Sequence, residues 1–458
     1  MTPRELVPRE REIAVIGLAR SGRAVALLLA KRGYKVYASD VASSPETGRC
    51  AEELRALGIA VDIGRHDLER LARAALVVTS PGVPPSAKPL AFAREMRIPV
   101  ASEVEVALNF LDGPRIIATT GTNGKTTTTA LIAHLLRGLD VEAVEAGNIG
   151  TPLSEIAGRE PQPKWISLEM SSFQLHDTPS LKPVVGVLTN LSPDHLDRYA
   201  TVADYYSDKA RLFANADGDS VWVINDDDKG VLQMARDVAG HKYLFSLSEE
   251  ADACLDQRTG QLIVLGTPLI QRQDLPLLGQ HNVGNALAAA LAVMAADRSH
   301  QTPQARKGIA RALATFRSLP HRLELVGEFD GVQWINDSKA TNVSSTAVAI
   351  DGMERPTVLL LGGRHKGEAY TGLTESVRRR VKRVIAYGEA ASIIAKDLRP
   401  VVDVVRLGSD FNEVMDAARA AAEAGDAVLL SPACSSYDMF SNYEERGERF
   451  RALATKEA

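Results

Sequence analysis

Short apolar runs rich in β-branched residues alternate with helical patterns along this chain of 458 residues. Ile13–Ile16 predicts a buried strand, Ser21–Arg32 predicts a helix, and Lys35–Ala38 predicts a second strand. Leu76–Thr79 predicts a third strand. Because the strands alternate with helices that can connect them, the pattern predicts a mostly parallel, doubly wound sheet.

A second series of strands and helices begins after Gly113-Pro114. Arg115–Thr119 predicts a strand, and Lys125–Arg137 predicts the helix that follows it. The stretch Ala251–Ile270 differs, because apolar and polar residues alternate on both sides of a Thr259-Gly260 turn. This alternation predicts a small antiparallel patch.

A third series begins near Leu319-Pro320, beyond an alanine-rich helix predicted over Asn282–Ala296. Its expected strands run from Trp334-Ile335 to Ala427–Leu430. The chain is therefore expected to be an α/β protein of three domains. These are an N-terminal Rossmann-like sheet in residues 1–112, a central P-loop ATPase-like parallel sheet with the antiparallel patch in 113–318, and a C-terminal Rossmann-like sheet in 319–458.

Composition narrows the class of protein. Hydrophobic residues make up 45% and charged residues 24%, as in ordinary globular proteins. The net charge of −5 argues against a general nucleic-acid binder, which would usually be basic. The cysteines Cys50, Cys254 and Cys434 form no CxxC pair, which fits a reducing compartment. Neither a signal peptide nor a stretch of about 20 apolar residues is visible, so we expect a cytoplasmic protein without a membrane partner.

The segment Gly121–Thr127 joins a predicted strand directly to a predicted helix. Backbone N–H groups of such a loop and of the helix N-terminus form an anion-binding site. Lys125 would reach the β- and γ-phosphates of ATP, and the hydroxyl of Thr126 would ligate Mg²⁺. Thr119 stands where the general phosphate-loop pattern has its first glycine. The predicted ATP-binding residues of the loop are Gly121, Thr122, Asn123, Gly124, Lys125, Thr126 and Thr127.

Three residues farther along the chain are candidates for the reaction centre. Glu169 follows a predicted strand at the carboxyl end of a parallel sheet, where such sheets bind ligands, and a carboxylate suits Mg²⁺. His195 could ligate a metal, act as a base or fill a polar loop. Lys209 lies in the helical stretch Tyr205–Asn215, and by itself it has the pattern of a solvated lysine.

A glycine-containing turn, Gly17-Leu-Ala-Arg-Ser-Gly22, follows the first predicted strand and opens a helix. With Asp40 at the end of the next strand it is similar to the dinucleotide fingerprint G-x-G-x-x-G, although Ala19 replaces the middle glycine. Taken alone, this fingerprint keeps an NAD(P)-dependent oxidoreductase open. Ser80-Pro81-Gly82 ends a further strand and is either a plain turn or part of the same pocket.

Together these segments resemble the Mur ligase family of peptidoglycan synthesis. The matching segments occur in the family's order through most of the chain. They are Thr120–Thr127, Asn148–Gly150, Leu168–Leu175, Asn190–Tyr199, Lys209, His281–Asn285, His321-Arg322, Asn336–Asn342 and Ser431–Ser436.

The resemblance implies roles that the chemistry of the residues alone does not reveal. In the family, the lysine that matches Lys209 is carbamylated by CO₂, and the carbamate could hold a second Mg²⁺. The histidine that matches His195 contacts the substrate region and that second ion. The implied catalytic residues are Lys125, Glu169, His195 and Lys209, and the implied metal ligands are Thr126, Glu169, His195 and carbamylated Lys209.

The resemblance also distributes three small-molecule substrates over the chain. In the third domain Tyr443 departs from the commoner phenylalanine. Asn282, Asn285, Arg322 and Asp337 would contact ATP, with the third domain closing over it. Gly17, Ala19, Ser21, Gly22, Asp40, Ser80, Gly82, Asn148 and His195 would bind a UDP-sugar. Thr341, Lys366, Ser436 and Tyr443 would bind an amino acid.

Two absences favour the glutamate-adding branch of the family. The third domain has no D-N-P-R stretch, and the N-terminal loop lacks the form G-I-G-G-x-G-M-S-G. The expected reaction is ATP-dependent ligation of D-glutamate to UDP-N-acetylmuramoyl-L-alanine through an acyl phosphate, by a monomer in cytoplasmic peptidoglycan precursor synthesis. The alternatives are a ligase similar to folylpolyglutamate synthase, which lacks a full N-terminal UDP-binding domain, and a P-loop nucleotide-binding protein without ligase chemistry.

Overall fold

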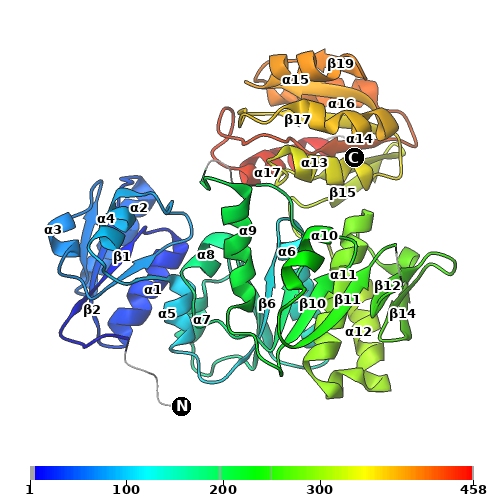
Figure 1. Cartoon of the computed structure of the whole chain (residues 1–458). Coiled ribbons are helices and arrows are strands. Elements are labelled where there is room, and N and C mark those ends of the chain that lie inside the picture. Colours follow the sequence, from blue (N-terminus) through cyan, green and yellow to red (C-terminus); the bar gives the residue numbers. More distant parts are fainter. Residues whose placement is uncertain (1–5, 195–197, 249, 456–458) are drawn as a thin grey trace. The chain divides into compact units, whose positions relative to one another are not determined.

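The computed structural model describes residues 6–194, 198–248 and 250–455. They form an α/β fold with three separate sheets, which confirms the expected fold class (Figure 1). The chain divides into two compact units, of which the first holds two sheets and the second holds one. Unit 1 comprises Met1–Arg272 and Gly284–Ala314, and unit 2 comprises Gln273–Val283 and Thr315–Ala458. The three domain boundaries inferred from the sequence stay a prediction.

The first sheet of unit 1 is parallel, with the strand order β3-β2-β1-β4-β5. Its central strand β1 is almost wholly buried, as expected for a parallel sheet covered by helices on both faces. The strand β3 was not predicted, and its burial explains this, because Val61 is its one buried residue. The elements are β1 (Glu12–Ile16), α1 (Arg20–Lys31), β2 (Lys35–Asp40), α2 (Pro45–Ala56), β3 (Ala60–Ile63), α3 (Leu68–Leu71), β4 (Leu76–Thr79), α4 (Lys88–Glu95), β5 (Val100–Ser102) and α5 (Glu103–Leu108).

The second sheet of unit 1 has the order β14-β13-β12-β11-β10-β9-β6-β8-β7. The seven strands from β7 to β12 in this order pair in parallel. The last two pairings, of β13 with β12 and with β14, are antiparallel, which confirms the predicted antiparallel patch. The strands are β6 (Arg115–Thr120), β7 (Ala143–Gly147), β8 (Trp165–Glu169), β9 (Val185–Leu188), β10 (Val221–Asn225), β11 (His241–Ser246), β12 (Ala253–Asp256), β13 (Gln261–Val264) and β14 (Thr267–Gln271).

Helices connect and cover the strands of this second sheet. The predicted helix over Lys125–Arg137 is present with those bounds. The alanine-rich helix begins at Gln280, two residues before its predicted start, so Asn282 lies inside the helix and does not cap it. The helices are α6 (Lys125–Arg137), α7 (Leu153–Ala157), α8 (Ser172–His176), α9 (Val202–Ala210), η1 (Arg211–Phe213), α10 (Lys229–Ala235), η2 (Arg272–Asp274), α11 (Gln280–Ala296), η3 (Arg298–Gln301) and α12 (Pro303–Thr315).

The sheet of unit 2 has the order β15-β16-β20-β17-β18-β19. Only the edge pairing of β15 with β16 is antiparallel, and the other pairings are parallel. The elements are β15 (Glu324–Phe329), β16 (Val332–Asn336), α13 (Val343–Asp351), β17 (Thr357–Gly362), η4 (Tyr370–Leu373), α14 (Thr374–Arg380), β18 (Val381–Tyr387), α15 (Ala391–Leu398), β19 (Asp403–Arg406), α16 (Phe411–Ala421), β20 (Ala427–Leu430) and α17 (Tyr443–Ala454).

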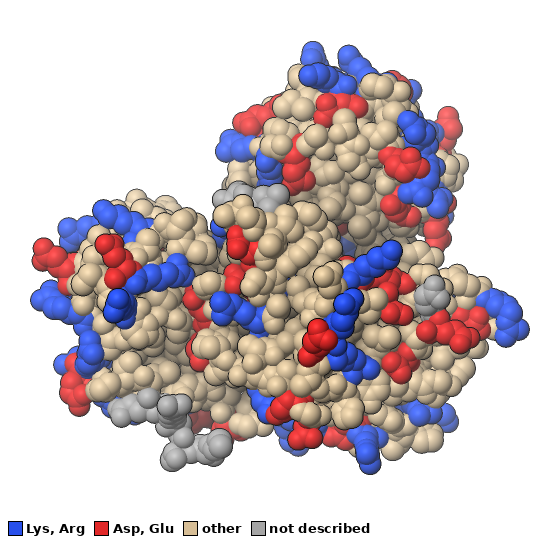
Figure 2. All heavy atoms as spheres, viewed as in Figure 1, with Lys and Arg blue, Asp and Glu red and all other residues tan. Residues whose placement is uncertain are grey.

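Charges of both signs are interspersed on the face of the molecule shown in Figure 2. Several charged side chains form ion pairs, such as Arg383 with Asp403 at 2.7 Å and Arg379 with Asp351 at 3.0 Å. Exposed pairs of this kind contribute little to stability. Within the part of the chain that the structure describes, no helix combines the length and the apolar character that crossing a membrane requires.

Candidate active site

The predicted phosphate loop connects β6 to α6 at the carboxyl end of the second sheet. Gly124 precedes the helix with φ of +80°, and a Cβ there would lie 2.3 Å from Oδ1 of Asn285. The loop is also held by Asn190, which accepts hydrogen bonds from the backbone N–H groups of Thr122 (2.9 Å) and Asn123 (2.8 Å). Glycine is therefore required at position 124, and the loop conformation is fixed by residues distant in the sequence.

The ammonium group of Lys125 lies over its own loop. Its Nζ donates to the carbonyl oxygens of Gly121 at 3.0 Å and Thr122 at 2.7 Å. Next to it, Thr126 and Thr127 are buried in the first turn of α6. The positive charge is thus held close to the helix N-terminus, where an anion is also favoured by the helix dipole.

Glu169 is the last residue of β8, one residue closer to the strand than predicted, and it is 1% exposed. Its Oε1 accepts a hydrogen bond of 2.8 Å from Nδ2 of Asn148, and its backbone carbonyl accepts from the N–H of Asn148. Its Oε2 is buried and has no hydrogen-bond partner. A buried, unsatisfied carboxylate oxygen is costly, and a bound cation would remove that cost. The donor set therefore fits Mg²⁺, a hard cation that prefers oxygen ligands.

Lys209 is not a solvated lysine, because its side chain is 1% exposed. Nζ donates a hydrogen bond of 2.5 Å to the Gly121 carbonyl and lies 4.6 Å from the centre of the Tyr205 ring. Burial lowers the pKa of Lys209 well below its ordinary value, and the nearby charge of Lys125 lowers it further, against the opposing charges of Asp194 and Glu169. A larger fraction of Lys209 is therefore a neutral amine, the form that reacts with CO₂.

These groups border a cleft of about 310 Å³ within unit 1. Its lining residues come from five segments of the chain. They are Pro81, Gly82, Lys125, Asn148, Ser171, Ser172, Phe173, Arg198, Tyr205 and Lys209. The structure therefore brings together the predicted residues Gly82, Lys125, Asn148 and Lys209, while Glu169 adjoins them through Asn148.

Three aromatic or cationic residues of this cleft, Tyr205, Arg198 and Phe173, had no role predicted from the sequence. Tyr205 donates to Oγ1 of Thr122 at 3.3 Å, and the guanidinium of Arg198 lies 5.1 Å from the centre of the Phe173 ring. A signal for Tyr205 was available in its position four residues before Lys209 on one helix, since residues at that spacing share a face. His195 lies outside the described residues. Among the residues that the structure does describe, no group of three His, Cys, Asp or Glu side chains gathers to hold a metal ion.

A second cleft in unit 1, of about 500 Å³, lies at the predicted nucleotide-sugar residues. Gly22 is required there, because a Cβ on it would lie 1.7 Å from the carbonyl oxygen of Gly17. The lining residues of this second cleft are Ile16, Gly17, Ala19, Arg20, Ser21, Asp40, Val41, His66, Ser80, Pro81, Gly82, Val83, Pro84, Ala87, Gly147 and Asn148. Of the predicted set, Gly17, Ala19, Ser21, Asp40, Ser80, Gly82 and Asn148 line this cleft.

Asp40 stabilises the loops around this second cleft. Its Oδ2 accepts a hydrogen bond of 2.6 Å from the N–H of Leu18, and its Oδ1 accepts one of 2.8 Å from the N–H of Ala42. His66 stands beside it, with Nδ1 2.9 Å from Oγ of Ser39. The carboxylate thus joins the glycine-containing turn to the loop after β2. A nucleotide-binding site at this turn would need both segments to be held in place.

Of the ATP residues predicted in unit 2, Arg322 and Asp337 lie close enough for their charges to interact. Asp337 accepts hydrogen bonds from Oγ of Ser431 at 2.9 Å and from the N–H of Leu323 at 3.2 Å. Burial raises the pKa of Asp337 to about 7, although these bonds and the charge of Arg322 act in the opposite direction. Asn282 donates to the carbonyl of Leu278 at 2.7 Å.

Two of the four predicted amino-acid-binding residues are in direct contact. Nζ of Lys366 donates to Oγ1 of Thr341 at 3.3 Å. Tyr443 lies near a different cation, because Nζ of Lys339 is 3.8 Å from the centre of its ring. Ser436 is buried in the loop after β20. No hydrogen bond between described residues joins Ser436 to Lys366 or Thr341.

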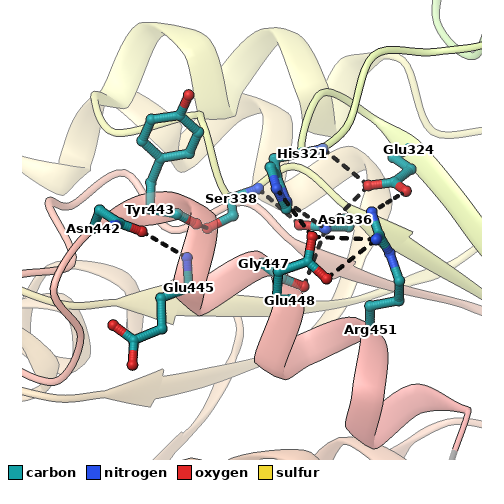
Figure 3. A network of polar contacts seen from close by, with 10 residues as sticks. All are labelled: His321, Glu324, Asn336, Ser338, Asn442, Tyr443, Glu445, Gly447, Glu448 and Arg451. Atoms are coloured by element: carbon teal, nitrogen blue, oxygen red, sulfur yellow. Dashed lines mark hydrogen bonds and ion pairs between the residues drawn. The ribbon is translucent and has the colours of Figure 1, made fainter.

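A network of polar contacts links segments of unit 2 that lie far apart in the sequence (Figure 3). Asn336 donates to Nδ1 of His321 at 3.0 Å and to the carbonyl of Gly447 at 3.2 Å. Glu324 accepts from the N–H of His321 at 2.9 Å and from Arg451 at 2.5 Å. The network joins β15 and β16 to the helix α17 that carries Tyr443.

One buried arginine connects three loops of unit 2. Arg446 is 0% exposed, and it donates to Oγ (2.9 Å) and to the carbonyl (2.8 Å) of Ser338. It also donates to the carbonyl of Cys434 at 3.2 Å and to that of Gly362 at 3.5 Å. The loops after β16 and β20 and the end of β17 therefore share one cation, which donates to three backbone carbonyls and one hydroxyl.

Comparisons with known proteins decide the family. A Mur ligase MurD-like N-terminal domain matches residues 11–102, a Mur ligase middle domain matches 119–293, and a Mur ligase glutamate ligase domain matches 321–434. The UDP-N-acetylmuramoylalanine--D-glutamate ligase of Desulfatibacillum aliphaticivorans is 39% identical over 444 residues, covering 96% of this chain and 97% of that protein. The chain belongs to the Mur ligase family.

Other Mur ligases agree with this assignment. The protein of the same name from Salinibacter ruber is 39% identical over 468 residues, and the match covers 99% of this chain and 99% of that protein. Among solved structures, the UDP-N-acetylmuramate-alanine ligase of Thermotoga maritima matches with a TM-score of 0.62 and 18% identity, over 98% of this chain and 100% of that one. At this identity the likeness concerns the fold, and it agrees with the three-sheet architecture of this Mur ligase.

Proposed function

We propose that this Mur ligase joins D-glutamate to UDP-N-acetylmuramoyl-L-alanine with consumption of ATP, in peptidoglycan precursor synthesis in the cytoplasm. The observation that carries the proposal is that Lys125 and Lys209 line one cleft, next to Glu169, which is bonded to Asn148 of the same lining. The full-length relatives of this chain bear the proposed activity in their names. We further propose that the chain works as a monomer on these small molecules alone.

The first step of the proposed reaction makes an acyl phosphate. The carboxylate of UDP-N-acetylmuramoyl-L-alanine attacks the γ-phosphorus of ATP, a C–O–P bond forms, and ADP leaves. Lys125 and the N–H groups of residues 121–127 hold the phosphates and stabilise the negative charge that develops on the transferred group. The other ATP contacts that we propose are Asn282, Asn285, Arg322 and Asp337.

The second step forms the amide bond. The amine of glutamate attacks the acyl carbon, phosphate leaves, and the amine loses a proton. Lys366 and Thr341, which are in contact, would bind a carboxylate of the amino acid through the ammonium and hydroxyl groups. Ser436 and Tyr443 complete the proposed amino-acid site.

Mg²⁺ would be held by the free oxygen of Glu169, the hydroxyl of Thr126 and the phosphate oxygens of ATP. Bound there, the ion supplies positive charge that stabilises the phosphoryl group during transfer. We propose a second ion, held by His195 and by a carbamate on Lys209. The support for the carbamate is the lowered pKa of Lys209, because only the neutral amine adds to CO₂.

The residues of the second cleft would hold the UDP moiety. We propose that the turn from Gly17 to Gly22 faces the diphosphate, because backbone N–H groups at a helix N-terminus bind phosphate. Asp40, Ser80, Gly82 and Asn148 would line the remainder of the site. The domains proposed for these functions are residues 1–112 for the UDP-sugar, 113–318 for ATP and 319–458 for the amino acid.

The test is release of phosphate from ATP with each substrate omitted in turn. We expect release only when UDP-N-acetylmuramoyl-L-alanine, D-glutamate and Mg²⁺ are all present, with a peptide-bonded product found by mass spectrometry. L-glutamate and other amino acids serve as matched controls. Hydrolysis of ATP without the UDP-sugar would contradict a ligase, and turnover with a folate substrate instead would favour a ligase similar to folylpolyglutamate synthase.

A further inference from the structure

The cleft of about 500 Å³ has three charged or titratable side chains in its lining: Arg20, Asp40 and His66. Asp40 already accepts hydrogen bonds from Leu18 and Ala42 with both of its oxygens. Arg20 is exposed and makes no ion pair with any described residue. Its guanidinium is therefore a cation in the cleft that no described acidic residue neutralises.

The turn that precedes Arg20 departs from the dinucleotide fingerprint at one position. Gly17 and Gly22 occupy the first and third glycine positions, and the middle position is Ala19. In the fingerprint the middle glycine lets the backbone approach the pyrophosphate closely. Ala19 lines the cleft as the N-cap residue of α1, so a methyl group is present at the position that the fingerprint reserves for glycine.

The start of α1 also favours an anion. The first turn contains no acidic residue, and the N-cap side chain makes no hydrogen bond to the first N–H groups. Such groups have no partner within a helix. Arg20 is the first residue of α1, so its side chain extends from the point at which these N–H groups begin.

We infer that Arg20 binds the diphosphate of the nucleotide-sugar and compensates for the closer backbone approach that Ala19 prevents. This inference rests on the proposed function, because that function requires a nucleotide-sugar bound in this cleft. A guanidinium offers parallel N–H donors that match two phosphate oxygens, and it keeps its charge at every physiological pH. Arg20 is thus a substrate-binding residue that takes no part in the chemical steps.

The first test compares two arginines on the same helix. Arg23 lies one turn later and is paired with Glu53 at 2.6 Å outside the cleft lining. We expect Arg20→Ala to raise the KM for UDP-N-acetylmuramoyl-L-alanine on the order of tenfold to a hundredfold, with the KM values for ATP and glutamate unchanged. Arg23→Ala should leave all three KM values as in the wild type, and Arg20→Lys should fall between wild type and Arg20→Ala.

The second test separates phosphate binding from a structural effect. Calorimetric titration with UDP and with uridine measures binding without turnover. The affinity for UDP should fall in Arg20→Ala and lose part of its salt dependence, while that for uridine should not change. Equal losses for both probes, or a KM for the UDP-sugar within twofold of wild type, would overturn the inference.

The third test addresses compensation by a double-mutant cycle. Ala19→Gly removes the methyl group at a position where glycine is well tolerated as an N-cap. If Arg20 compensates for Ala19, then Arg20→Ala should cost less affinity for UDP in the Ala19→Gly background than in the wild-type background. Additive effects would overturn the compensation. The wild type could require the UDP-sugar for turnover while Arg20→Ala is unaffected. That result would contradict this inference but not the proposed function.

Discussion

The candidate active site of unit 1 and the loops of unit 2 differ in how their buried polar groups are hydrogen-bonded. In unit 1 the carboxylate of Glu169 has one buried oxygen without a partner, and Lys209 is buried against one carbonyl and one ring. In unit 2 the buried guanidinium of Arg446 donates to four oxygens, and Asn336 donates to His321, Glu324 and Gly447.

The contrast separates two uses of buried polarity. A satisfied network such as that around Arg446 fixes the conformation of loops, because breaking any bond leaves a buried group unpaired. A group without a partner costs stability, and its retention at the end of a strand indicates a ligand that completes it. Substitutions in unit 1 should therefore reduce activity more than stability, and substitutions in the network of unit 2 should do the reverse.

The largest effect is expected for Lys125→Ala. Loss of the ammonium over residues 121–127 should lower kcat/KM about a thousandfold, because this charge acts where the phosphoryl group is transferred. The melting temperature should stay close to that of the wild type, since the ammonium group donates to two carbonyls of its own loop, those of Gly121 and Thr122. Steady-state phosphate release measures kcat/KM, and differential scanning fluorimetry measures the melting temperature. Peptide-bond formation at an undiminished rate would refute the proposed role of the loop.

A second prediction uses two glutamates that have the same burial. Glu169 and Glu103 are each 1% exposed, and in each Oε2 has no hydrogen-bond partner. Glu169→Gln should lower kcat about a hundredfold by weakening the metal site, and excess Mg²⁺ should restore part of the rate. Glu103→Gln should leave kcat unchanged, because Glu103 accepts its hydrogen bond from Ser154, which lines neither cleft, whereas Glu169 accepts one from Asn148, which lines both. Equal losses in the two variants would mean that the loss at Glu169 reflects removal of any buried carboxylate and not a metal site.

The third prediction concerns stability in unit 2. A Cβ on Gly447 would lie 2.1 Å from Nδ1 of the buried His321. Gly447→Ala should lower the free energy of unfolding by about 1–3 kcal/mol, because the overpacking outweighs the better helix propensity of alanine. Gly408→Ala is the matched control, since a Cβ there would meet no atom within 4 Å. Chemical denaturation measures both, and equal stability of the two variants would contradict the tight packing of α17 against His321.

A fourth prediction concerns the pH dependence of stability that Glu103 contributes. Burial raises the pKa of Glu103 to about 7, although its hydrogen bonds from Ser154 oppose the rise. The folded state therefore holds its proton to a higher pH than the unfolded state, so stability falls as the pH rises from about 4.5 to about 7 and stays lower above that. The change amounts to about 3 kcal/mol. Denaturation curves at pH 5 and pH 8 should differ less for Glu103→Gln than for the wild type, and equal differences would contradict this assignment.

The sequence predicted the elements whose signal is local. The helix over Lys125–Arg137 and the antiparallel patch follow from glycine placement and from periodicity, and both are present. The strands β3 and β15 were missed because few or none of their residues are fully buried, so their apolar pattern is weak. Periodicity cannot reveal such edge strands, which are specified by their neighbours in the sheet.

Contacts between distant segments could not be predicted from the residues alone. The pairing of Asn148 with Glu169 depends on the parallel pairing of β7 with β8. The burial of Lys209 depends on the packing of α9 against the loop at Gly121. A lysine on a helix has the same local pattern whether it is buried or solvated, so only the family resemblance pointed to Lys209.

The hydrogen bond from Lys209 to the Gly121 carbonyl has a practical consequence if the amine takes up CO₂. The carbonyl fixes one N–H and can retain it after the carbamate forms, so the modification can come and go without rebuilding the phosphate loop. The fraction of active enzyme would then depend on the concentration of dissolved CO₂. A preparation kept in degassed buffer should start slowly and accelerate on addition of bicarbonate.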